Sequence, residues 1–174
     1  AIQHALAAGD PDGAAHMMEQ GLCDVLNRQD WATLRRWPYL LPLDLRMRRP
    51  GLQILEGWLR YFSLQTGALV ALLEEFEVQL AGCAATMATE EIHLLRGQAL
   101  TLRAMTAYFS SQPAASIACA QEALRLLPER WSFVRGSCTF WLGVSGQVNG
   151  QGEAFRRILW ASYKAAPVKG DNFA

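Results

Sequence analysis

The sequence lacks the residue patterns by which metal centres and disulfide frameworks are usually identified. Its three histidines are far apart, and none belongs to an HExxH pattern. The four cysteines are equally scattered and form no CxxC pair: Cys23, Cys83, Cys119 and Cys138. A metal site needs several ligands close together, and a small disulfide-rich fold needs paired thiols. We therefore expect neither a bound metal nor a disulfide framework. The scattered cysteines favour buried, inert thiols in a reducing compartment.

Motifs that bind phosphate or activate a nucleophile are also absent. The chain contains no GxxxxGK[ST], GxGxxG or GxSxG sequence. The glycines between Gly143 and Gly152 lie in a predicted helix and its turn, whereas a phosphate-binding loop follows a strand. The acidic run Glu74, Glu75 and Glu77 lies on the exposed side of an amphipathic helix. We therefore expect no catalytic residues, no cofactor in this segment and no enzymatic activity.

Neither a charge imbalance nor a long apolar run is present. Sixteen basic residues balance sixteen acidic ones, which argues against a nucleic-acid-binding face. The longest uncharged runs, 104–121 and 136–152, are interrupted by Ser, Gln, Asn, Gly or Pro, so neither predicts a membrane span. No signal peptide and no initiator Met are seen, and we expect a cytoplasmic segment of a larger protein. With half of its residues apolar, the chain is predicted to form one folded domain over 1–174.

The sequence does contain a strong helical-hairpin pattern, centred on residues 97–130. Small residues recur at spacings of three and four in both halves, including Ala104 in the first and Ser116 and Ala120 in the second. Pro113 suits a first helical position, and Pro128 ends the second helix. With Gly97 as position 1, these residues fit the 34-residue tetratricopeptide register, although its usual aromatics are missing. The alternative is a generic antiparallel helical hairpin.

Similar patterns extend over the rest of the chain. We expect helices over residues 1–8, 12–27, 31–37, 50–67, 68–81, 131–148 and 153–166, and a long helix that follows Thr89. Asp12 and Thr89 are predicted to cap the helices that they precede. The proline-rich segment 38–50 is predicted to be a packed connector carrying the basic cluster Arg46, Arg48 and Arg49. Gly57, Ala104 and Gly143 occupy equivalent small positions of three first helices. The predicted fold class is therefore all-α, a superhelical stack of antiparallel helical hairpins resembling a tetratricopeptide solenoid.

The repeat register also predicts a binding groove. In stacked hairpins of this type, side chains near positions 2, 5, 9 and 12 of each first helix line the concave side. These positions combine aromatic area with hydrogen-bonding groups, as small-ligand and peptide sites do. The alternative is that several of them pack against the neighbouring hairpin. The predicted groove residues are Trp58, Tyr61, Gln98, Thr101, Met105, Tyr108, Phe140 and Gln147.

Several short motifs, in order along the chain, resemble one protein family. AIQHALAAGD followed by AAHMME, then Trp37, Leu41–Pro42, Arg49–Pro50 and Trp58, are similar to the entry of the helical-repeat region of MalT-like regulators. These are large ATP-dependent LuxR-type bacterial transcription activators. The likeness continues through Leu127–Pro128 and Leu142–Gly143. The chain departs from the pattern at Pro38, where Leu is usual, and at Gly57, where Ala is usual.

The resemblance implies a ligand-sensing or self-association segment of a transcription regulator. It implies an ATP-binding module before the segment and a helix-turn-helix DNA-binding domain after it. The expected partner is a small-molecule inducer or a regulatory protein, and the segment could also self-associate. DNA would be contacted only through the helix-turn-helix domain. The alternative from a different class is a freestanding repeat scaffold that binds a peptide or protein.

Overall fold

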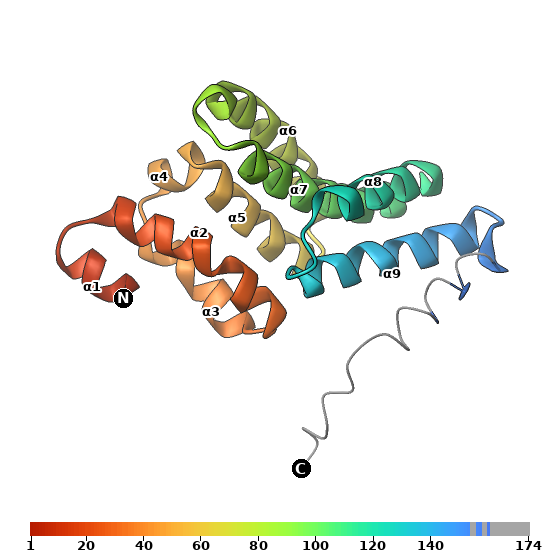
Figure 1. Cartoon of the computed structure of the whole chain (residues 1–174), viewed down its shortest axis with the longest axis horizontal. Coiled ribbons are helices and arrows are strands. Elements are labelled where there is room, and N and C mark those ends of the chain that lie inside the picture. Colours follow the sequence, from red (N-terminus) through yellow and green to blue (C-terminus); the bar gives the residue numbers. More distant parts are fainter. Residues whose placement is uncertain (154–155, 158–159, 161–174) are drawn as a thin grey trace, which may run out of the picture.

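A computed structural model of the chain describes residues 1–153, 156, 157 and 160 (Figure 1). These residues form helices joined by short turns and contain no strand, as the sequence predicts. No helix among them combines the length and apolarity needed to cross a bilayer. The helices are α1 (Ile2–Ala7), α2 (Pro11–Asn27), α3 (Trp31–Arg36), η1 (Trp37–Leu40), α4 (Leu43–Arg48), α5 (Pro50–Phe62), α6 (Thr66–Cys83), η2 (Ala84–Thr86), α7 (Thr89–Phe109), α8 (Pro113–Leu126) and α9 (Ser132–Val148).

The buried faces of most helices follow the predicted periodicity. In α6 the buried residues are Leu69, Leu72, Leu73, Phe76 and Leu80, the set expected from the sequence. In α8, Ser116, Ala120 and Ala123 are buried, and Pro113 occupies the first turn. Asp30 caps α3 by accepting a hydrogen bond from the Thr33 backbone N–H at 3.0 Å. Local pattern and tertiary packing therefore agree over these helices.

Four helix boundaries differ from the prediction. The packed connector predicted over 38–50 contains short helices, with Pro38 in the first turn of η1 and Pro42 directly before α4. The cap of α2 is Asp10 rather than Asp12. Thr89 is the first residue of α7 and caps nothing. Gly67 lies inside α6, because the preceding helix already ends at Phe62. The expected helix over 153–166 lies largely outside the described residues.

The helices pack in series as successive hairpins. α5 packs against α6, and α7 packs against α8. Each second helix also contacts the next first helix, α6 with α7 and α8 with α9. The first helices contact one another in a row, α2 with α5, α5 with α7 and α7 with α9. In Figure 1 the chain accordingly runs from α2 through the α5–α6 and α7–α8 pairs to α9.

Small residues lie where neighbouring helices approach most closely. A side chain at Gly57 would meet Leu102 of α7 and Leu69 of α6, the first with its Cβ only 2.7 Å from Cδ1. Ser116 Oγ donates to the Ala104 carbonyl at 2.8 Å and accepts from Ser145 Oγ at the same distance. These three residues are fully buried, so the contact ties α7, α8 and α9 together. The predicted small positions therefore lie at helix seams.

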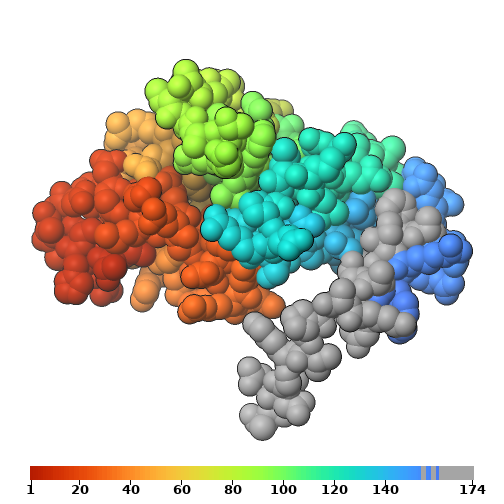
Figure 2. Space-filling view, in the orientation of Figure 1, coloured from red at the N-terminus to blue at the C-terminus, as the bar shows by residue number. Residues whose placement is uncertain are grey.

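Helices α2 and α9, near opposite ends of the described residues, also touch, which the sequence does not predict. Asn27 near the end of α2 donates through Nδ2 to the Arg130 carbonyl at 2.7 Å. Its Oδ1 accepts from the Phe133 backbone N–H at 3.0 Å. Figure 2 shows the end of α2 and the start of α9 meeting in the middle of the molecule. This contact brings residues more than a hundred positions apart into one surface.

Cys138 makes the stability of the chain sensitive to alkaline pH. Its fully buried thiol contacts Thr101 Oγ1 at 3.1 Å. The Thr101 hydroxyl donates its single proton to the Gly97 carbonyl, so the Cys138 thiol is the donor to Thr101. Burial raises the pKa of the Cys138 thiol from 9.0 to about 11. Because the folded state holds this proton more tightly, the stabilisation is complete below pH 9 and is lost as the pH rises toward 11.

We expect Cys138→Ser to weaken this dependence, because serine does not titrate in the range. Between pH 8 and 11 the parent chain should lose roughly 2–3 kcal/mol of unfolding free energy more than the variant does. Urea unfolding of both proteins at several pH values measures the difference. Parallel losses in the two proteins would show that the Cys138 proton contributes nothing.

Candidate functional site

Aromatic side chains from four helices form a continuous cluster across the row of first helices. Trp31 of α3 lies 4.2 Å from Phe62 of α5, and Phe62 lies 5.9 Å from Phe133 of α9, measured between ring centroids. Trp141 links this group to α7, with Tyr108 at 5.4 Å. Ring separations of this kind are typical of stabilising aromatic pairs. We call the following set the aromatic surface: Trp31, Tyr61, Phe62, Tyr108, Phe109, Phe133, Phe140 and Trp141.

Several rings of the aromatic surface remain open to solvent. Phe109 is 53% exposed, Phe140 is 51% exposed and Phe62 is 39% exposed. Single exposed apolar side chains are common, but contiguous exposed aromatic area marks binding surfaces. Phe140 and Phe109 both contact Trp141, at 5.0 and 6.0 Å. The exposed rings are therefore held in place by the cluster beneath them.

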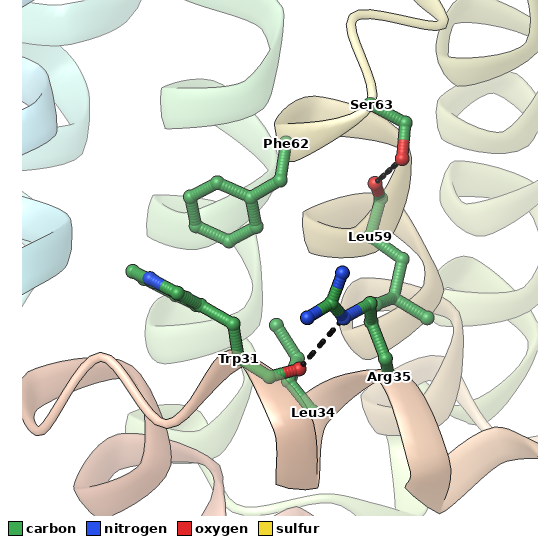
Figure 3. A pocket seen from close by; sticks show the side chains of 6 residues that line it. All are labelled: Trp31, Leu34, Arg35, Leu59, Phe62 and Ser63. Atoms are coloured by element: carbon green, nitrogen blue, oxygen red, sulfur yellow. Dashed lines mark hydrogen bonds between the residues drawn. The ribbon is translucent and has the colours of Figure 1, made fainter.

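Two cavities lie along this surface. One of about 230 Å³ separates α3 from the end of α5 and is lined by Trp31, Leu34, Arg35, Leu59, Phe62 and Ser63. Figure 3 shows the rings of Trp31 and Phe62 next to each other in its wall, with Arg35 donating through Nε to the Trp31 carbonyl. The second, of about 390 Å³, lies between α5 and α9 and is lined by Tyr61, Phe62, Phe133, Gly136, Ser137 and Phe140. Phe62 lines both, so the cavities adjoin.

The polar groups of this region are few, and all of them except Arg35 are neutral. Trp141 Nε1 donates to the Tyr61 hydroxyl at 3.1 Å. Burial raises the pKa of Tyr61 above its ordinary value of 10.0, so the hydroxyl stays protonated at neutral pH. Arg35 is the single charged residue among those lining the two cavities. The described residues contain no cluster of His, Cys, Asp and Glu that would hold a metal ion. The surface suits apolar or aromatic groups with an occasional hydrogen-bonding atom.

The structure divides the predicted groove residues into two groups. Trp58, Gln98, Thr101 and Met105 are at most 1% exposed. Trp58 Nε1 donates to Gln98 Oε1 at 3.1 Å, which pairs two of these side chains in the interior. They pack between hairpins, which is the alternative considered from the sequence. Their burial supports the aromatic surface from below and removes them from the open groove that the sequence predicts.

Tyr61, Tyr108 and Phe140 belong to the aromatic surface. Tyr61 and Tyr108 are half-buried, and Phe140 projects into solvent. Gln147 is exposed near the end of α9, and no ring or hydrogen-bond contact joins it to the aromatic surface. Sequence reasoning missed Trp31, Phe62, Phe109, Phe133 and Trp141. Four of these residues lie near helix ends, which is a signal in the sequence, but only the packing of α9 against α5 and α7 shows that these aromatics meet.

Comparisons with known proteins point to one kind of protein. The chain is 30% identical over 152 residues to the HTH-type transcriptional regulator MalT of Yersinia enterocolitica, which covers 86% of this chain and 16% of that protein. It is 30% identical over 149 residues to the regulators of the same name from Yersinia pestis and Yersinia pseudotuberculosis. The chain thus spans about a sixth of the length of these relatives. No family model and no solved structure matches it.

Proposed function

We propose that this chain is a signal-receiving helical segment of a MalT-like, LuxR-type transcription regulator. The similarity to MalT proteins and the all-helical fold support a regulator-like segment. The serial packing of α5–α6, α7–α8 and α9 supports a tetratricopeptide-like superhelix, a fold that offers extended binding surfaces. On this proposal the segment acts in the cytoplasm, has no catalytic activity and depends on other domains of the regulator for ATP and DNA.

The single observation that carries the proposal is the partly exposed aromatic surface. It is built from four helices that lie far apart in the sequence, so it exists only in the packed stack. Well-supported aromatic side chains with a solvent-exposed edge are the residues that dominate binding energy at interfaces. A partner that covers Phe109 and Phe140 would also stabilise the contact between α7 and α9. Ligand binding and a change in packing between hairpins would thereby be coupled.

The proposal is tested by changing exposed rings in the full-length regulator. We expect the double variant Phe109→Ala, Phe140→Ala to need about tenfold or more signal for half-maximal transcription. Val78→Ala on α6 is the matched control, because Val78 is 73% exposed and lies outside the aromatic surface. Val78→Ala should unfold within about 0.5 kcal/mol of the parent. The aromatic variant should lose about 1–3 kcal/mol with its two ring contacts to Trp141, so the dose–response is measured at a temperature where both variants are folded. A reporter gene and thermal unfolding give the two readouts.

An unchanged dose–response in the aromatic variant would contradict this role for the surface. A freestanding scaffold would use the same surface, but no transcriptional readout would then depend on it. Loss of peptide or protein binding in the variant, with normal transcription, would therefore favour the scaffold.

A further inference from the structure

A third cavity, of about 590 Å³, lies where α2, α7 and the start of α9 meet. It shares no lining residue with the two cavities of the aromatic surface. Its volume falls within the range of small-ligand sites. Leu22, Leu94 and Leu95 supply apolar wall, while Asp24, Glu91 and Arg130 supply charge. The two cavities of the aromatic surface, by contrast, have Arg35 as their single charged lining residue.

Two buried donors line this cavity without an acceptor among the described residues. The Trp131 side chain is 3% exposed, and its Nε1 has no hydrogen-bond partner. Gln98 is 1% exposed, and its Oε1 accepts from Trp58. Because an indole N–H only donates, this bond fixes the Gln98 oxygen toward Trp58 and leaves its amide N–H groups for another acceptor. A buried donor left unpaired costs roughly 1–3 kcal/mol, so Trp131 Nε1 favours an acceptor, and the Gln98 amide nitrogen is left to donate to the same kind of partner.

The charged groups of the cavity are similarly available. Glu19 is already occupied, since Arg49 Nη2 lies 2.6 Å from its Oε2. Asp24, Glu91 and Arg130 form no side-chain ion pair within the part of the chain that the structure describes. The cavity therefore presents two free carboxylates, one free guanidinium and two unpaired donor nitrogens around an apolar wall. A ligand that satisfies all of them needs both an acceptor end and a cationic end.

We propose that this cavity binds a short peptide with free termini. The peptide carboxylate and carbonyl oxygens would accept from Gln98, Trp131 and Arg130. The terminal ammonium would pair with Asp24 and Glu91, and an apolar side chain would lie against the leucines. This site goes beyond the proposed function, since it is separate from the aromatic surface. A bound peptide would bridge α2, α7 and α9 beside the Asn27 contact and hold it closed.

The site is tested by isothermal titration calorimetry of the chain with the tripeptide Ala-Leu-Ala. We expect binding with a dissociation constant below about 1 mM, weakened about tenfold or more by N-acetylation and likewise by C-terminal amidation. The double variant Asp24→Asn, Glu91→Gln should bind the free and N-acetylated peptides equally. Arg130→Gln should remove the effect of amidation, and its exposed side chain is not needed for the Asn27 contact, which uses the backbone carbonyl.

No binding at about 10 mM peptide would overturn the proposal, as would binding that neither blocked terminus weakens. Phe140→Ala should bind the tripeptide as the parent does, because Phe140 lies outside this cavity. Equal loss in that variant would show that the peptide binds the aromatic surface instead and would also overturn the proposal. If the transcriptional response depends on Phe140 but the chain does not bind the tripeptide, the proposed function stands and the peptide site is rejected.

Discussion

Replacing Trp58 by alanine is expected to lower the unfolding free energy by about 3–5 kcal/mol, the cost of truncating a fully buried tryptophan. Trp58 is 0% exposed and contacts the rings of Tyr61, Phe62 and Phe133. Its loss would leave a cavity beneath the aromatic surface and deprive Gln98 Oε1 of its donor. The loosened rings should also bind any partner less well.

Urea unfolding followed by circular dichroism measures this effect. Trp58→Phe is the matched control, because it keeps an aromatic ring and removes the N–H. We expect it to cost about 1–3 kcal/mol, chiefly from the unpaired Gln98 oxygen. A loss below about 1 kcal/mol in Trp58→Ala would contradict the central position of this side chain.

The second large effect is expected at Ser116. Ser116→Leu should destabilise the chain by at least about 3 kcal/mol, because overpacking a tight seam costs roughly 1–3 kcal/mol and losing buried hydrogen-bond partners costs a similar amount. The Ser116 side chain lies between Ala104 of α7 and Ser145 of α9 with no room for added atoms. The substitution would therefore separate three helices at once.

Ser116→Ala separates the two causes, since it removes the hydrogen bonds without adding volume. We expect it to cost about 1–2 kcal/mol, in line with buried hydrogen bonds elsewhere. Thermal unfolding of both variants gives the comparison. If Ser116→Leu were no less stable than Ser116→Ala, the seam would not be closely packed and the repeat register would be wrong.

Local periodicity was sufficient to predict which helix faces are buried. The spacing of Leu69, Phe76 and Leu80 defines one face of α6 without reference to any other helix. The small residues Gly57 and Ala104 were likewise predicted to lie at helix seams, because only close approach explains small side chains at equivalent positions. These features depend on residues close together in the sequence, and the sequence therefore predicts them well.

The candidate site depends on contacts that local pattern does not contain. The repeat register predicts Trp58 and Met105 in an open groove, but both are at most 1% exposed in the row of helices α5, α7 and α9. Asn27 makes the first of these contacts with backbone groups of Arg130 and Phe133, more than a hundred residues away. Helix ends were missed for a different reason, since Asp10 and Asp12 are equally good caps until the turn geometry is known.

The central claim is that the aromatic surface receives the signal. Hydroxyl-radical footprinting of the full-length regulator, with and without its activating signal, tests this most directly. Phe109 and Phe140 are both about half exposed, and Val78 on α6 is 73% exposed and serves as the internal control. We predict that the signal lowers the oxidation rate of both phenylalanines about threefold or more, as expected when a partner excludes solvent from a binding hot spot, and leaves Val78 unchanged. Unchanged oxidation of Phe109 and Phe140, or equal protection of Val78, would contradict the account.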